Sequence, residues 1–156
     1  MTKYDWLLLV HVLGAFLFVS GSLVAGILAL AATQRERPSE VALLLRLVRP
    51  AVAIVGIGSL VALAVGIWLA EYVGYGLGKG WIVAAIALWA ASGALGGPAG
   101  RTMRETRELA ERLAQEGDQP SEELRLALRN PRPLAMNTAA FALLIAILVL
   151  MVWKPG

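Results

Sequence analysis

The side chain best suited to chemistry in this sequence is His11, the only histidine among 156 residues. It lies within the apolar run LLLVHVLGAF at residues 7–16, where an imidazole without a partner would cost free energy. Three roles fit such a residue: an axial ligand of haem, a proton relay, or a hydrogen bond to a neighbouring helix. An ionisable side chain inside a membrane-spanning segment usually marks a functional site.

Haem is the cofactor that one histidine can hold within a helical bundle, because a single imidazole binds the iron with methionine, lysine or water opposite. Met151 and Lys79 are candidates for the opposite axial position, since both are predicted at a depth similar to that of His11. Lys79 is also placed to pair with a haem propionate. Gly14 and Phe18 follow His11 on the same helical face and would line the pocket.

The elements that must position these residues are membrane-spanning helices. The chain is 58% hydrophobic and only 16% charged, with a mean hydropathy of +0.70, whereas a soluble domain is about a quarter charged. A spanning helix needs roughly 20 mostly apolar residues. Segments of that kind lie at about 5–32, 50–72, 80–98 and 134–154.

These segments predict an all-α fold, an antiparallel four-helix membrane bundle that forms one domain over residues 1–156. Pro50 is a favourable first residue for the second span. The connector at 99–133 has arginine and glutamate four residues apart, which favours an exposed helix. Ser121 is placed to cap a second short helix that ends near Arg129, so we expect a helical hairpin. Its surface is either solvated or a docking site for a partner protein or anionic lipid.

The basic residues predict an orientation. All eleven arginines fall in the two segments 35–49 and 101–132, whereas Lys3, Lys79 and Lys154 lie at the opposite ends of the spans. The positive-inside rule then places both arginine-rich segments in the cytoplasm and both termini outside. This distribution explains the isoelectric point near 9.7 without nucleic acid as a partner.

Several other sites are excluded by residue type. The sequence has no cysteine, which excludes disulfides, iron–sulfur clusters and cysteine-bound zinc. Asp5 and Asp118 are predicted on opposite sides of the membrane, so no Ser-His-Asp triad is credible. The run VGYG at 73–76 resembles a potassium filter but leaves no room for a pore helix, and a glycine-rich turn is expected at 74–80.

Small residues at four-residue spacing predict where the helices approach closely. The second span has such a stripe, which consists of Gly58, Ala62, Gly66 and Ala70. The fourth span has alanines at alternating four- and three-residue steps, which favours a seam within the bundle. They are Ala135, Ala139, Ala142 and Ala146.

Two motifs resemble a known family. LLVHVLGAFLFVSG at 8–21 and LVLMVWKP at 148–155 resemble the first and last spans of a bacterial family of predicted integral membrane proteins of unknown function. The order of His11, Lys79, Asn137 and the closing Lys-Pro is also similar to that of CopD-like and HemJ-like four-span proteins. The resemblance implies a multi-pass protein of the bacterial inner membrane that binds haem b through His11. For HemJ-like proteins it further implies oxidation of protoporphyrinogen.

The function favoured by the sequence is therefore a haem-binding membrane protein with a redox role. A cofactor-free accessory or structural bundle, as a homo-oligomer or as a subunit beside another membrane protein, is the main alternative. A transporter for a small solute or for copper is a third, although the sequence lacks a cluster of methionines or histidines for copper.

Overall fold

Helices make up almost the whole structure over residues 2–154, the part of the chain that the computed structural model describes. In order they are α1 (Lys3–Ala32), α2 (Pro38–Tyr72), α3 (Gly80–Gln115), α4 (Glu122–Arg129) and α5 (Pro131–Trp153). Four stretches are long and apolar enough to cross a membrane, namely α1, α2, α3 and the segment Glu122–Trp153 that contains α5. The all-helical, four-span prediction is confirmed.

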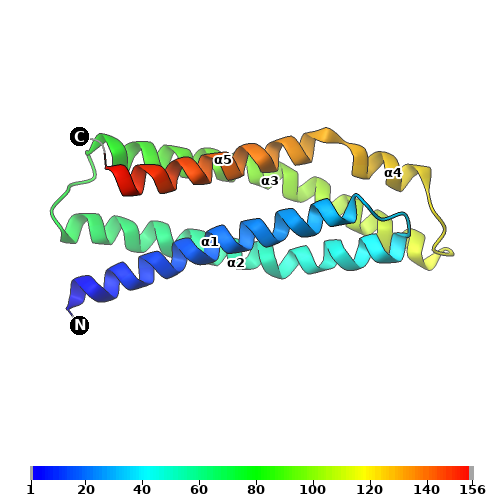
Figure 1. Ribbon diagram of the computed structural model, residues 1–156, viewed down its shortest axis with the longest axis horizontal. Helices are drawn as coiled ribbons and strands as arrows, with labels where there is room; N and C mark the ends of the chain where they lie inside the picture. Colours follow the sequence, from blue (N-terminus) through cyan, green and yellow to red (C-terminus); the bar gives the residue numbers. More distant parts are fainter. Residues whose placement is uncertain (1, 155–156) are drawn as a thin grey trace.

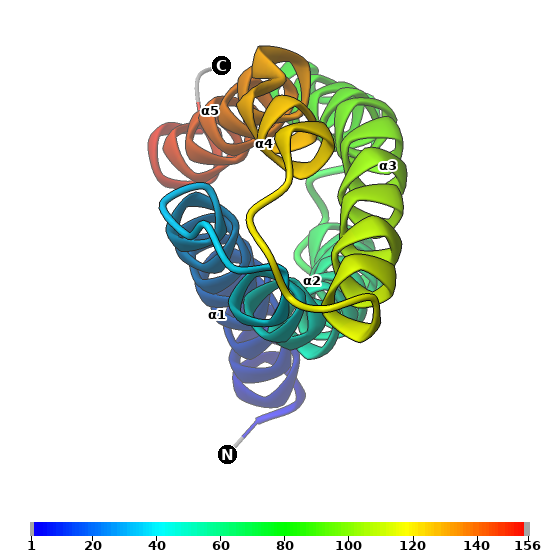
Figure 2. The same cartoon turned by 90° about the vertical axis from the view of Figure 1, so that its right-hand side faces the viewer.

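The helices are arranged as two pairs (Figure 1). α1 packs along α2, and α3 packs along α5, while contacts between α2 and α3 join the pairs. α1 and α5 scarcely touch, although the view along the bundle shows both on the side away from α3 (Figure 2). We call the end that holds Lys3, Tyr72, Gly80 and Trp153 the terminal end, and the opposite end the arginine-rich end.

The prediction that the second helix begins at Pro50 is wrong. Pro50 lies inside α2, and Pro38 occupies its first turn instead. An internal proline removes a helical hydrogen bond, but the turns before Pro50 bury an apolar face. Val41, Leu45 and Val48 are each at most 5% exposed, so packing sustains the helix well before the membrane span.

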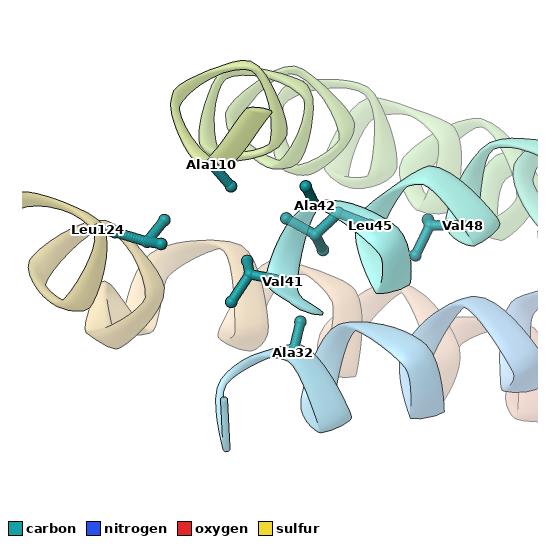
Figure 3. Close-up of a cluster of buried hydrophobic side chains, with 7 residues drawn as sticks. All are labelled: Ala32, Val41, Ala42, Leu45, Val48, Ala110 and Leu124. Carbon is teal, nitrogen blue, oxygen red and sulfur yellow. The ribbon is translucent and has the colours of Figure 1, made fainter. Parts of the chain in front are cut away.

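The arginine-rich end is closely packed, and we call it the head. Figure 3 shows the buried cluster at its core. The buried cluster combines α1, α2, α3 and α4, and its members are Ala32, Val41, Ala42, Leu45, Val48, Ala110 and Leu124. α3 runs without a break from the span to Gln115. The connector does form a helical hairpin with a second helix at Glu122–Arg129, but its first arm is a continuation of the third span.

Asp118, in the turn between α3 and α4, caps α2 from outside that helix. The preceding residue Arg37 makes no capping bond. Instead the Asp118 carboxylate accepts the Ser39 backbone N–H and the Ser39 hydroxyl, both at 2.7 Å. These bonds lower the pKa of Asp118, because they and nearby Arg37 stabilise the charged carboxylate. The turn is thereby fixed to the start of α2.

The small-residue stripe of α2 marks a close helix approach, as predicted, and at Gly58 and Gly66 the neighbouring helix is α1. A Cβ at Gly58 would lie 2.6 Å from the Phe18 nitrogen and 2.7 Å from the Gly14 carbonyl oxygen. Only hydrogen at this position allows the two backbones to approach so closely.

The alanine seam predicted for α5 is wrong. Ala135, Ala139 and Ala142 are exposed, and α5 packs through the neighbouring face that contains Phe141 and Leu144. A leucine buries more apolar surface than an alanine, which favours burial of the face that contains Leu144.

Candidate functional site

Two cavities lie inside the bundle, and each is lined by α1, α2, α3 and α5. The histidine cavity, of about 440 Å³, is at the terminal end and has His11, Trp81 and Met151 in its wall. The glycine cavity, of about 670 Å³, extends towards the arginine-rich end and has Gly96 and Gly100 in its wall. Both volumes fall in the range of roughly 300–1,000 Å³ in which proteins hold small molecules and cofactors.

His11 is held by the backbone of α2. Its Nδ1 lies 2.9 Å from the Ala62 carbonyl oxygen. A carbonyl can only accept, so Nδ1 is the nitrogen that donates this hydrogen bond, and the tautomer that the bond favours leaves the lone pair on Nε2. Gly66 makes room for the ring, because a Cβ there would lie 2.8 Å from His11 Cε1. The imidazole is thus oriented, with one nitrogen left to act as acceptor or ligand.

Met151 lines the same cavity from α5. It is half-buried and packs against the apolar cluster of Ala70, Trp81 and Ile82. Because α1 and α5 make almost no direct contact, space remains between the helices that bear His11 and Met151. The sequence prediction that these two side chains belong to one region is therefore consistent with the structure.

Of the remaining predicted site residues, one lines the histidine cavity and two do not. Phe18 lines the histidine cavity. Gly14 does not; a Cβ there would lie 2.8 Å from the Ala62 nitrogen, so this glycine serves the contact between α1 and α2. Lys79 is exposed at the start of α3 and is not part of the cavity wall.

Lys154 is the lysine that borders the histidine cavity. Its Nζ lies 5.4 Å from the ring centre of Tyr75, and Tyr75 meets Trp81 edge to face at 5.7 Å. Lys3 lies at the same end, with its Nζ 5.4 Å from the ring centres of Trp68 and Tyr72. One cation–aromatic contact, that of Lys154 with Tyr75, therefore borders the cavity, and the other lies at the same end of the bundle. The sequence of residues 74–80 predicted only a turn, and the position of Tyr75 beside the cavity did not follow from it.

A layer between the two cavities was also missed. Phe18, Ser59, Trp89 and Leu144 each line both cavities, and each comes from a different helix of the bundle. The Trp89 indole N–H donates to the Ser59 hydroxyl at 2.7 Å, which satisfies both groups within an apolar interior. A serine and a tryptophan inside apolar spans were the available signal for this pair.

Metal-binding donors are sparse. Within residues 2–154, no three side chains of histidine, cysteine, aspartate or glutamate are grouped closely enough to hold a metal ion. A metal at His11 would therefore need to bring most of its ligands with it, as the iron of haem does.

Comparison with known proteins identifies a family. The family model described as Predicted integral membrane protein (DUF2269) matches residues 5–155. No curated protein and no solved structure gives a significant match.

Proposed function

We propose that this chain, which belongs to that family of predicted integral membrane proteins, binds haem b in the histidine cavity with His11 as an axial ligand. The observation that supports this most directly is the hydrogen bond from His11 Nδ1 to the Ala62 carbonyl oxygen. Histidines that bind metals usually donate their second ring nitrogen in this way, because the bond fixes the tautomer and the ring orientation.

The lining of the cavity fits the group in chemical type. Nε2 of His11 would bind the iron, and the Met151 thioether, which lines the same cavity, would be the second ligand from this chain. Aliphatic and aromatic side chains dominate the wall and would exclude water from a macrocycle. Lys154, at the mouth, offers a cation for a propionate. Lys79 would reach a propionate only from outside the cavity wall.

Haem would supply one-electron redox chemistry at this site. The chain's own contribution is to orient the imidazole through Ala62, to admit the ring beside Gly66, and to keep the site apolar. Those roles suit a redox protein whose site lies within a membrane at the terminal end. We also propose that the arginine-rich end faces the cytoplasm, as the arginine distribution indicates.

The deciding experiment is the absorbance spectrum of the detergent-purified protein before and after addition of dithionite. We expect a Soret band and a shift on reduction. His11→Ala should lose the band while keeping its helical circular dichroism, and added imidazole should restore it by occupying the vacated space. Met151→Leu conserves side-chain volume, so it should alter the spectrum or the potential but keep the haem.

Wild-type protein that contains no haem, and takes none up when it is added, would exclude this function. His11 would then serve as an interhelical hydrogen-bond donor worth about 1 kcal/mol, and the cofactor-free bundle would be the better interpretation.

A further inference from the structure

The glycines in the wall of the glycine cavity have different surroundings from the glycines at the close helix contacts. Six helical glycines line it: Gly26, Gly56, Gly93, Gly96, Gly97 and Gly100. A Cβ added at any of these would meet no atom within 4 Å. They differ in this from Gly14 and Gly58, where a Cβ would collide with the neighbouring backbone. The six glycines therefore keep a space open instead of bringing two helices together.

Open space of this kind is costly without an occupant. A glycine inside a helix is about 1 kcal/mol less favourable than alanine, and protein interiors otherwise pack without large voids. The wall is mostly apolar, with Ser22, Ser92, Asn137 and Thr138 among its few polar residues. An occupant of this cavity is thus an apolar, hydrocarbon-like group.

The cavity can be entered from the side. Leu23 and Ile27 of α1 and Leu134 and Phe141 of α5 line it, and these two helices hardly touch one another. Leu23, Ile27 and Leu134 are each more than half exposed, so the cavity reaches the outer surface that the apolar spans present to lipid. A hydrocarbon chain can therefore pass from the bilayer into the cavity without crossing a polar region.

Three arginines lie at one level at the arginine-rich end of this cavity. Arg49 is 23 residues before the end of α2, Arg101 is 21 residues after the start of α3, and Arg132 is 21 residues before the end of α5. At helical rise each lies about 32–35 Å from the terminal end, just beyond a hydrocarbon core of about 30 Å. Val48 and Gly100, which precede two of them, line the cavity.

These three arginines also lack carboxylate partners. In the head, most arginines pair with glutamate, as Arg46 does with Glu111 at 3.1 Å and Arg104 with Glu108 at 2.8 Å. Among residues 2–154, neither Arg49, Arg101 nor Arg132 makes an ion pair. Their guanidinium groups are free at the depth of lipid phosphates, where arginine binds phosphate oxygens well.

We propose that the glycine cavity is a binding site for an anionic phospholipid, with an acyl chain inside the cavity and its phosphate among Arg49, Arg101 and Arg132. The apolar wall fits the chain, the opening between α1 and α5 admits it, and the unpaired arginines complement the headgroup. This site is separate from the histidine cavity, so the proposal does not depend on haem.

The test is native mass spectrometry of the full chain. Protein is placed in nanodiscs that contain equal amounts of phosphatidylglycerol and phosphatidylcholine with identical acyl chains, and then released into detergent. We expect the wild type to retain phosphatidylglycerol. Gly96→Leu should lose it, because the new side chain fills the cavity, yet should melt no lower than wild type. Gly80→Leu, outside the cavity wall, is the matched control and should keep the lipid.

The arginines are tested by the triple variant Arg49→Gln, Arg101→Gln and Arg132→Gln. Each basic side chain near a membrane surface contributes about a factor of five in affinity for anionic lipid, so the preference for phosphatidylglycerol should fall roughly a hundredfold. A control with the same loss of charge neutralises three arginines of the head. They are Arg104, Arg112 and Arg125.

Three results would overturn the proposal: no retained lipid, equal retention of both lipids by the wild type, or unchanged retention by Gly96→Leu. A mass that corresponds to two chains without lipid would show instead that a second copy fills the opening. His11→Ala should retain lipid like the wild type, so failure of the haem proposal and failure of this one are distinguishable.

Discussion

Gly58→Ala tests whether α1 and α2 are in backbone contact at the level from which His11 is held. The added Cβ would lie 2.6 Å from the Phe18 nitrogen, 2.7 Å from the Gly14 carbonyl oxygen and 2.8 Å from Leu17 Cβ. Two of these atoms belong to the backbone and cannot rotate away. Overpacking of an interior usually costs about 1–3 kcal/mol, and contact with backbone places this variant near the upper end.

Alanine also favours the helix over glycine by about 1 kcal/mol, so the net loss for Gly58→Ala should be about 2 kcal/mol. Gly56→Ala is the matched control, because a Cβ there meets nothing within 4 Å. That variant should be stabilised by up to about 1 kcal/mol. The two variants should therefore differ by roughly 3 kcal/mol when unfolding in detergent is titrated with dodecyl sulfate and followed by circular dichroism.

Equal stability of the two variants would refute the packing argument. It would mean that α1 and α2 are separated near Gly58. His11 would then be too far from the Ala62 carbonyl to make its hydrogen bond.

Three further predictions concern orientation, acid sensitivity and the histidine ring. A cysteine at Gln115 should be protected from impermeant thiol reagents in intact cells and one at Leu77 should be labelled; the reverse pattern would invert the proposed orientation. The pKa of Asp118 is lowered by its bonds to Ser39, so its stabilising effect is complete above the unfolded pKa and is lost as the pH falls through the lower folded value. Asp118→Asn should therefore flatten the decline in melting temperature below about pH 4, and a decline as steep as that of the wild type would exclude this cause. Gly66→Ala should press on the imidazole, 2.8 Å from the new Cβ, and change the haem spectrum more than the stability, whereas an unchanged spectrum would separate the ring from the cofactor.

Apolar length and the position of turn residues predicted the spans well. The turn at 74–80 also followed from sequence, and positive φ angles of 81° at Gly74 and 69° at Gly76 explain why glycine is required there. Ser121 does precede α4, although its side chain makes no capping bond. Local signals such as these depend only on neighbouring residues, which is why they transfer directly from sequence to structure.

The rotation of each helix about its own axis was harder to predict from the sequence. Depth along the membrane placed Lys79 and Met151 alike near His11, but only Met151 lines the cavity, because depth says nothing about which way a side chain points. The prediction that the alanines of α5 form a seam within the bundle was wrong for the same reason. The first turns of α2 depend on long-range contacts, such as Val41 within the cluster that includes Leu124, and no local pattern around Pro50 shows them.

The cavities in the centre of this bundle suggest that its function depends on molecules bound inside it. A four-helix bundle normally fills its centre with interdigitated side chains. Here Leu144 is the one buried residue of α5. Two cavities occupy the centre, and the layer that contains Trp89 and Ser59 lies between them. One cavity has a single oriented imidazole and the other has glycines that contact nothing. Small residues thus have two separate tasks in this bundle: Gly14 and Gly58 bring α1 and α2 together, whereas the glycines that contact nothing leave space in its centre.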